Sequence, residues 1–394
     1  MFESLLNHPE KPVSGLAVIQ FKGGEITHRA GYGLHGSPST RFRIASISKF
    51  VMTMAVAQAA EAGLLDLDAD VSKLLGFKLR HPAYPTSPIT LTHLLSHTST
   101  LRDATAYSMP LPHKIQEFFE PGTPWFEDGD HFSPEDEGPP GRFFAYCNLN
   151  YGVAASVLEK VTGQRFDLYM REKIFEPLGI RPSYNVSLFT PAEIADLAPI
   201  VRLQDGAWRP QVDDHRGIVP PPLSVIENPD VQEKYVERFG NIRPSLDLAG
   251  YELGSNGTIF SPQGGLRISA DELFVIFRYF SESYQAGAAW TRTMLNPIWR
   301  HDGSNGNNYA GLMQAWGLGT HLFEDQLAGL GITNRNLVGH LGDAYGLLSG
   351  LLFDPESEDG LIYIIGGTSC PLEEHPGRHT SFSAWEEEIL QQLL

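Results

Sequence analysis

Cysteine, basic residues and long apolar runs are all scarce in this sequence of 394 residues. No run approaches the roughly 18 apolar residues that a membrane-spanning helix needs, and residues 1–14 contain no apolar leader. The two cysteines, Cys147 and Cys370, could pair or stay free, but without a leader the free, reduced state is favoured. We therefore expect a cytoplasmic protein with two free thiols.

The shortage of positive charge limits the possible partners. Lysine and arginine number 29 against 47 acidic residues, which gives a net charge of -18. Such a surface repels nucleic acid and anionic membranes, so we expect neither as a partner. The 42% hydrophobic content and the length allow one large domain with an insertion, or two domains.

Ser46 and Lys49 lie three residues apart at the start of an apolar run, residues 50–60, that predicts a buried helix. On a helix this spacing stacks both side chains on one face, where a neutral lysine can take the serine proton as the hydroxyl attacks. The helix start disfavours an ammonium and so predicts a lowered pKa for Lys49. The alternative is a solvated lysine beside a serine that caps the helix. The apolar run argues against it, because a lysine in the first turn of a buried helix is not simply solvated.

The remaining pattern predicts an α/β (α+β) fold with strands at both ends of the chain. Residues 15–33 alternate around a Gly23-Gly24 turn and predict a β-hairpin. Further strands are predicted at 315–323, 336–341, 347–354 and 361–367, and helices at 91–97, 151–161, 270–280 and 382–394. We expect residues 1–65 and 256–394 to form one discontinuous sandwich domain of sheet and helices.

Residues 66–255 are then a mainly helical insertion with long loops. Residues 120–141 hold seven acidic side chains among prolines and glycines, and residues 220–255 show little periodicity. Loops of this length are typical of functional lids or of disorder. A run of charge is nevertheless most often a solvated face.

Two further motifs follow Ser46-x-x-Lys49 in order, namely Tyr146-x-Asn148 and His340-x-Gly342. This series resembles the β-lactamase-related serine hydrolases, which include class C β-lactamases, DD-peptidases, D-amino-acid amidases and family VIII esterases. Residues 92–99, 150–163, 175–179 and 264–271 are similar to connecting segments of that family, so the resemblance covers most of residues 15–370. It implies a β-lactamase/transpeptidase-like antiparallel sheet flanked by helices, with the helical insertion carrying Tyr-x-Asn.

The resemblance also implies catalytic roles. Ser46 would be the acylated nucleophile, and Lys49 and Tyr146 would share the work of the base. An ammonium held near Tyr146 would lower the pKa of the phenol. Which of the two takes the proton stays open. No cofactor or metal is implied.

The other motif residues would position the substrate. Asn148 would orient a substrate carbonyl or side chain, although it could instead be a helix cap. His340 would hydrogen-bond near Tyr146, although it could be a strand histidine satisfied by a neighbour. The residue after Gly342 lines the attacked carbonyl in the family, so the backbone N–H groups of Ser46 and Asp343 would form the oxyanion hole.

Departures from the family pattern bear on the substrate. Penicillin-recognising members carry a threonine where this chain has Leu341, so a carboxylate anchor is missing. Esterases and amidases, which need no such anchor, fit better. Asp343 could pair with an amine of the substrate, although a solvated carboxylate is the simpler interpretation. We expect a small ester, amide or short peptide as substrate, with DD-carboxypeptidase or β-lactamase activity and an inactive ligand-binding homologue as alternatives, and the oligomeric state open.

Three other patterns are interpreted as structural. Residues 31–36 spell G-x-G-x-x-G, but Pro38 follows where a phosphate-binding helix should begin. His93 and His97 have the spacing of a zinc-protease helix without its glutamate. Residues 213–215, Asp-Asp-His, lack a second ligand cluster and are expected at the surface.

Overall fold

The computed structural model describes residues 2–215, 248–333 and 335–394. Its centre is an eight-stranded antiparallel sheet in the order β2-β1-β12-β11-β10-β9-β8-β7. The strands are β1 (Gly15–Lys22), β2 (Glu25–Gly33), β7 (Trp299–Arg300), β8 (Ala315–Trp316), β9 (His321–Phe323), β10 (Leu337–Ala344), β11 (Leu347–Phe353) and β12 (Gly360–Ile365). The predicted pairing of the N-terminal hairpin with C-terminal strands is therefore confirmed, because β1 lies against β12.

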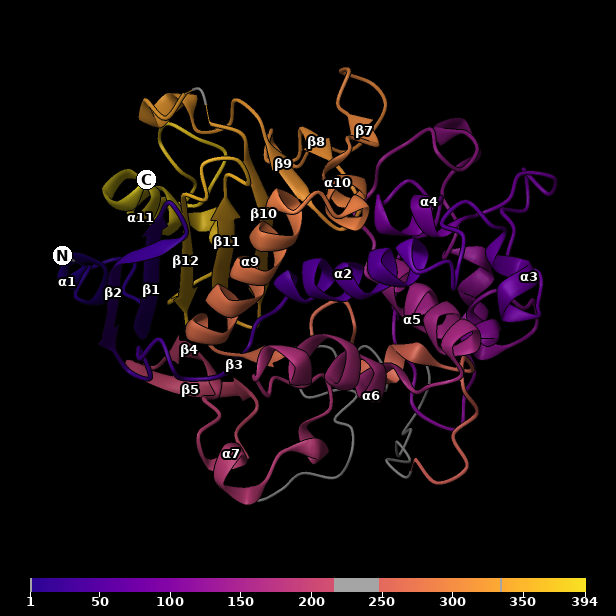
Figure 1. Cartoon of the computed structure of the whole chain (residues 1–394), viewed down its shortest axis with the longest axis horizontal. Helices are drawn as coiled ribbons and strands as arrows, with labels where there is room; N and C mark the ends of the chain where they lie inside the picture. The colour runs from indigo at the N-terminus through magenta and orange to yellow at the C-terminus, as the bar shows by residue number, and fades with distance from the viewer. Residues whose placement is uncertain (1, 216–247, 334) are drawn as a thin grey trace.

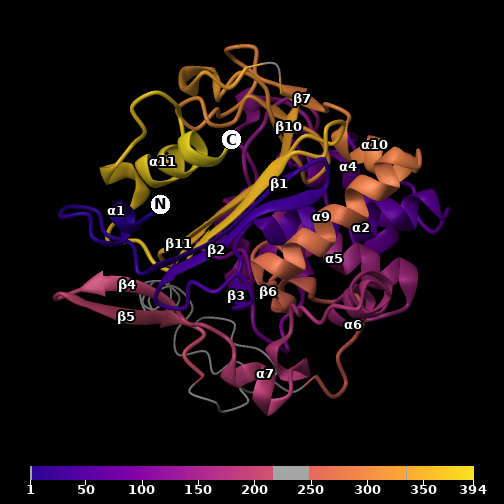
Figure 2. The same ribbon diagram turned by 60° about the vertical axis from the view of Figure 1, so that its left-hand side comes forward.

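Alternation along the strands separates two apolar layers. Leu16 and Val18 of β1 face a cluster that includes Trp385, while Ala17 and Ile19 face the larger core. Helix α11 (Ala384–Leu393) covers the first face, and α9 (Ala270–Gln285) and α2 (Ile47–Glu61) lie on the second, as Figure 2 shows. The sheet flanked by helices that the sequence predicted is thus present.

Helix α2 is buried nearly all round, as its apolar run predicted. It begins after a sharp turn in which Ala45 takes a positive φ of 52°. The hydroxyl of Ser48 fixes this turn by donating to the Ala45 carbonyl at 2.6 Å and accepting from the Leu266 amide at 3.1 Å. Ser46 therefore stands at a constrained corner between β3 (Phe42–Arg43) and the helix.

Helices α3 (Val71–Leu75), α4 (Leu91–Leu95) and α5 (Leu149–Thr162), from the middle of the chain, lie on the side of α2 away from the sheet (Figure 1). The next two helices, α6 (Phe166–Met170) and α7 (Pro191–Ala195), lie lower in that view, α7 beneath the sheet near β5. Elsewhere lie α1 (Glu3–Leu6), α10 (Ala289–Leu295) and β6 (Arg267–Ile268), which pairs with β3. The division into a discontinuous domain and an insertion stays a prediction.

Several elements differ from the sequence prediction. The expected strand at 315–323 is two strands, because Gly319, with φ of 56°, turns the chain between β8 and β9. The hairpin of β4 (Ile200–Gln204) and β5 (Ala207–Val212) and helix α10 were not predicted. Most of the loop expected at 220–255 lies outside the described residues.

Asp213 corrects a second expectation, since it is not at the surface. Its side chain is buried and accepts hydrogen bonds from Arg267 at 2.6 and 2.9 Å. The acidic segment 120–141 is also more structured than a solvated run, because Glu127 is buried and accepts from the amides of Thr105 and Ala106. In both places a carboxylate organises loop backbone or pairs with arginine.

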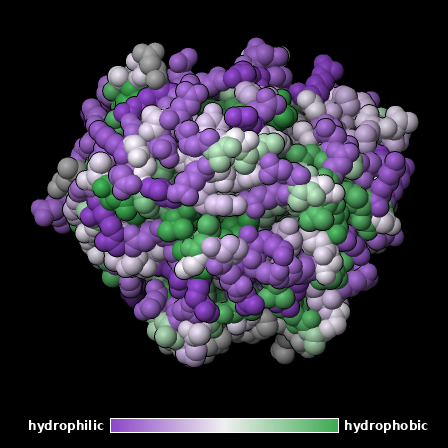
Figure 3. All heavy atoms as spheres, viewed as in Figure 1, coloured by the Kyte–Doolittle hydropathy of each residue, from purple (hydrophilic) through white to green (hydrophobic). Residues whose placement is uncertain are grey.

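Polar side chains cover most of the face in Figure 3, and the apolar residues form small separate patches on it. Within the described ranges, no helix is long and apolar enough to cross a membrane.

Candidate active site

The nitrogen of Lys49 lies between three oxygen atoms. It is 2.9 Å from the Ser46 hydroxyl, 2.8 Å from the amide oxygen of Asn148 and 2.8 Å from the backbone carbonyl of Gln263. The structure thus brings together Ser46, directly before α2, and Lys49, in its first turn, as their spacing predicted, and adds Asn148, directly before α5.

Burial dominates the electrostatics of Lys49. The side chain is fully buried, and this lowers its pKa to about 7, while the charge of Asp103 acts in the opposite direction. The lowered pKa agrees in direction with the sequence prediction, but its main cause is desolvation. Above pH 7 the neutral amine therefore predominates, with two N–H donors and one lone pair.

Two N–H groups and three oxygen neighbours define how the neutral amine must point. The Asn148 amide oxygen and the Gln263 carbonyl can only accept hydrogen bonds, so they take the two donors. The lone pair is then left for the third neighbour, the Ser46 hydroxyl, which can donate. This is the arrangement that a general base for serine requires.

Tyr146 contradicts the expectation of a lowered pKa. Burial raises the pKa of its phenol well above the ordinary value, and a hydrogen bond with Ser46 only partly opposes this shift. The ring lies over the Lys49 nitrogen, 4.7 Å from it, and stacks on His97 with a centroid separation of 4.3 Å. Tyr146 is therefore a neutral phenol beside the nucleophile, because desolvation outweighs the hydrogen bond with Ser46.

Neither of the two possible helix caps acts as one. The side chains of Ser46 and Asn148 precede α2 and α5, yet neither accepts a hydrogen bond from its helix. Asn148 instead accepts from Lys49 and donates its Nδ2 to Asp103 at 2.8 Å. Asp103 takes over the capping by accepting from the Leu149 amide at 2.9 Å.

His340 lies on β10 at the edge of the site without a hydrogen bond to Tyr146. Its Nδ1 donates to the Leu341 carbonyl at 2.6 Å, its Nε2 has no partner among the described residues, and its ring centroid is 6.4 Å from that of Tyr146. Burial, with the charge of Lys49, holds the pKa of His340 well below its usual range. The expected hydrogen bond near Tyr146 is therefore absent, and the histidine is satisfied at one nitrogen by its neighbour.

Gly342 allows β10 to approach the start of α2 closely. A Cβ at this position would lie 2.6 Å from the Ile44 carbonyl oxygen and 3.2 Å from the Ser46 amide nitrogen. Strand β9 pairs with β10 only up to Gly339, so the edge of β10 beyond that residue is open on this side. This geometry is compatible with the predicted oxyanion hole at the N–H groups of Ser46 and Asp343.

A cavity of about 260 Å³ opens over these groups. Its polar members besides Ser46 and Tyr146 are His321, His340, Asp343 and Glu386, and among the described residues that line it there is no lysine or arginine. Its apolar wall consists of Leu312, Met313, Trp316, Leu341, Leu348 and Leu372.

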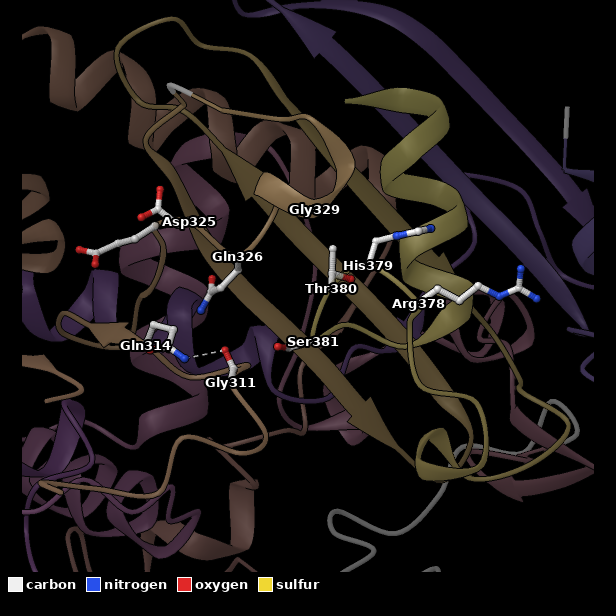
Figure 4. Close-up of a pocket in the computed structure, with 10 residues that line it drawn as sticks. Gly311, Gln314, Asp325, Gln326, Gly329, Arg378, His379, Thr380 and Ser381 are labelled. Atoms are coloured by element: carbon white, nitrogen blue, oxygen red, sulfur yellow. Dashed lines mark hydrogen bonds between the residues drawn. The ribbon is translucent and has the colours of Figure 1, made fainter. Parts of the chain in front are cut away.

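A larger polar hollow of about 500 Å³, shown in Figure 4, shares no lining residue with this cavity. Gln314 donates there to the Gly311 carbonyl at 3.0 Å, and Gln326 donates to the Leu312 carbonyl at 2.7 Å. Leu312 also lines the cavity over Ser46, so Gln326 links the two hollows through one hydrogen bond.

Reasoning from the sequence missed three residues of the site: Asp103, His97 and Gln263. His97 was considered only as a metal ligand, yet its Nδ1 accepts from the Cys147 amide at 3.0 Å and its ring supports Tyr146. Gln263 acts through its backbone, which carries no residue signal. Asp103 stands four residues beyond the family-like segment 92–99, which was the available hint.

A serine directly before a helix, a buried lysine in the first turn of that helix, a tyrosine beside them and an antiparallel sheet at one side are the arrangement of β-lactamase-type serine hydrolases. The family model described as Beta-lactamase matches residues 3–369. The chain belongs to the Beta-lactamase family.

Known proteins are similar at low sequence identity. Protein flp of Staphylococcus aureus (strain N315) is 26% identical over 174 residues, which are 42% of this chain and 34% of that protein. The matched part thus spans about a third of that relative's length.

Two solved structures share the fold. A beta-lactamase/D-alanine carboxypeptidase from Yersinia pestis has a TM-score of 0.63 at 18% identity and covers 97% of this chain and 93% of its own. A D-stereospecific amidohydrolase from Streptomyces sp. has a TM-score of 0.60 at 17% identity, and the match covers 100% of this chain and 97% of that protein.

Proposed function

We propose that this protein is a serine hydrolase that cleaves a small ester or amide through an acyl-enzyme on Ser46. The observation that carries the proposal is the 2.9 Å contact between the Ser46 hydroxyl and a buried Lys49 whose pKa is about 7. A base with this pKa is largely neutral at physiological pH and still basic enough to accept a proton.

In the first half of the reaction, the Ser46 oxygen attacks the substrate carbonyl carbon while its proton moves to the Lys49 nitrogen. The N–H groups of Ser46 and Asp343 would receive the negative charge on the carbonyl oxygen. Collapse of this intermediate breaks the bond to the leaving group, which takes the proton back from Lys49 directly or through the Tyr146 hydroxyl.

The second half repeats these steps with water. Water attacks the acyl carbon, gives its proton to Lys49, and the Ser46 oxygen leaves and is reprotonated. We assign the base to Lys49, because Tyr146 would need a pH far above the physiological range to ionise. Tyr146 then acts as a neutral proton relay.

The cavity wall favours an uncharged or cationic substrate over an anionic one. A β-lactam or a peptidoglycan C-terminus brings a carboxylate, and the described part of the cavity wall offers it Asp343 and Glu386 but no lysine or arginine. Leu341 supplies no hydroxyl in place of the missing anchor. The apolar residues of the wall suit a short acyl group or leaving group.

Asp343 is the residue that favours a positively charged substrate. The residue lines the cavity and keeps contact with solvent, but partial desolvation of its carboxyl group, together with the charges of Glu386 and Glu373 and against that of Arg202, raises its pKa to about 6. A substrate ammonium would offset that repulsion. We therefore extend the proposal to substrates with a free amine, such as amino esters, amino amides or short peptides.

One panel of substrates tests the proposal. Purified protein and its Ser46→Ala variant are compared on p-nitrophenyl esters, D- and L-amino-acid amides and the β-lactam nitrocefin. We expect Ser46-dependent turnover of esters or amides. Rapid nitrocefin turnover would favour the β-lactamase alternative, and no turnover with no fluorophosphonate label on Ser46 would favour an inactive binding homologue. The cytoplasmic location stays a prediction.

A further inference from the structure

Asp103 collects three hydrogen bonds at the entrance to helix α5. Its Oδ1 accepts from the Leu149 amide at 2.9 Å and from the Cys147 thiol at 3.3 Å, and its Oδ2 accepts from Asn148 Nδ2 at 2.8 Å. One carboxylate therefore binds a backbone amide, a thiol and the side-chain amide of Asn148, which in turn contacts Lys49.

The contact with Asn148 decides which way its amide points. A carboxylate can only accept hydrogen bonds, so it selects the NH₂ end of the amide and leaves the oxygen facing Lys49. If the amide were reversed, its NH₂ would meet the Lys49 amine. Lys49 would then lose one of the two acceptors that direct its lone pair at Ser46.

We propose that Asp103 is a positioning residue of the Ser46–Lys49 pair, which acts by fixing the Asn148 amide so that the Lys49 lone pair faces the Ser46 hydroxyl. This inference rests on the proposed hydrolase function. Asp103 does not line the cavity over Ser46, so it acts through Asn148 and not on the substrate.

The charge of Asp103 has a second consequence, which gives the proposal a distinctive readout. It raises the pKa of Lys49 and so partly opposes the lowering by burial. The other titratable groups around the amine are Cys147, Tyr146, Tyr151, His97 and His340. Burial raises the pKa values of the thiol and both phenols and lowers those of both imidazoles, so all five are neutral near pH 7.

The variant Asp103→Asn tests this role. It keeps the size of the side chain, removes the charge and allows the Asn148 amide to turn. We expect kcat for a neutral p-nitrophenyl ester to fall about 10- to 100-fold, with KM within about threefold of wild type, because the lost alignment concerns the proton transfer. The acid limb of kcat/KM should move to lower pH, because Lys49 loses the charge that supports its protonated form.

The direction of the pH shift separates this role from general damage. A loosened site would admit water and move the Lys49 pKa toward its ordinary value, so that the limb would move to higher pH. Asp70→Asn is the matched control, because Asp70 caps α3 by accepting from the Ser72 amide at 3.0 Å and does not line the cavity. It should leave kcat and the limb unchanged.

The possible failures are distinguishable. Turnover that survives Ser46→Ala overturns the proposed function itself. Turnover that needs Ser46 but shows wild-type kcat and an unmoved limb in Asp103→Asn overturns only the role of Asp103. If Asp103→Asn does not fold, Asp103→Glu replaces it. That variant keeps the charge but displaces the oxygens, so it should lower kcat and leave the acid limb of kcat/KM at the wild-type pH. A wild-type kcat in Asp103→Glu contradicts the proposal.

Discussion

The two ends of the candidate active site differ in how firmly the protein holds its polar groups. At one end Lys49 is fully buried and contacts three oxygen atoms at 2.8 to 2.9 Å. At the other end the residue Asp343 keeps contact with solvent, and its pKa is raised first by partial desolvation of the carboxyl group and then by the charge of Glu386. The buried end is preorganised for one chemical step, whereas the exposed end is suited to selecting among substrates.

The comparison predicts that substitutions at the buried end reduce turnover of every substrate, and that those at the exposed end change only the preference among substrates. Lys49→Met should produce the largest effect. Loss of the base should lower kcat for neutral esters and for amides by about 10⁴-fold. Steady-state kinetics on both substrate types measures this, with thermal unfolding to check the fold. A loss of less than tenfold would show that Lys49 is not the base.

Tyr146→Phe should have the next largest effect. It removes the hydroxyl that bonds Ser46 and keeps the ring that stacks on His97. We expect a fall in kcat of about 10²-fold from the lost proton relay, larger for amides than for activated esters, whose leaving group needs no proton. Equal losses for p-nitrophenyl esters and amides would exclude a role in protonating the leaving group.

Asp343→Asn should separate the two ends most clearly. Because an exposed ion pair contributes up to about 1 kcal/mol, KM for amine-bearing substrates should rise about fivefold. KM for neutral esters should stay unchanged, since they bring no cation. Glu373→Gln removes an exposed charge that does not line the cavity and serves as the control, with a smaller effect expected. Equal losses on neutral and amine substrates would remove the amine-binding hypothesis.

The pH dependence of the kinetic constants should report Lys49 and Asp343 separately. With neutral esters, kcat/KM should rise through pH about 7 as Lys49 loses its proton, and should fall about tenfold per pH unit below that value. With amine-bearing substrates KM should also rise below pH about 6, because protonation of Asp343 removes the negative charge. If both substrate types showed only the transition near pH 7, with KM independent of pH, Asp343 would have no separate role in binding the amine.

The sequence predicted the fold and the order of the motif residues because both depend on local patterns. Alternation placed β1 and β12 in one sheet, and the apolar run after Ser46 predicted the buried helix that lowers the pKa of Lys49. The spacing Ser-x-x-Lys is itself local, since one turn of helix joins the two side chains.

The features that the sequence did not reveal depend on contacts between distant segments. Asp103 meets Asn148 across 45 positions of sequence, and no spacing rule predicts such a pair. The raised pKa of Tyr146 follows from how deeply the folded chain buries the phenol, which a motif does not contain. His340 could be placed on its strand, but the direction of its hydrogen bond toward Leu341 could not.

Intact-protein mass spectrometry after mixing with a slowly hydrolysed p-nitrophenyl ester tests the central claim most directly. Wild-type protein should gain the mass of one acyl group, peptide mapping should place this group on Ser46, and Ser46→Ala should gain nothing. Turnover of the ester with no acyl group on Ser46, or an equal adduct on Ser46→Ala, would contradict it.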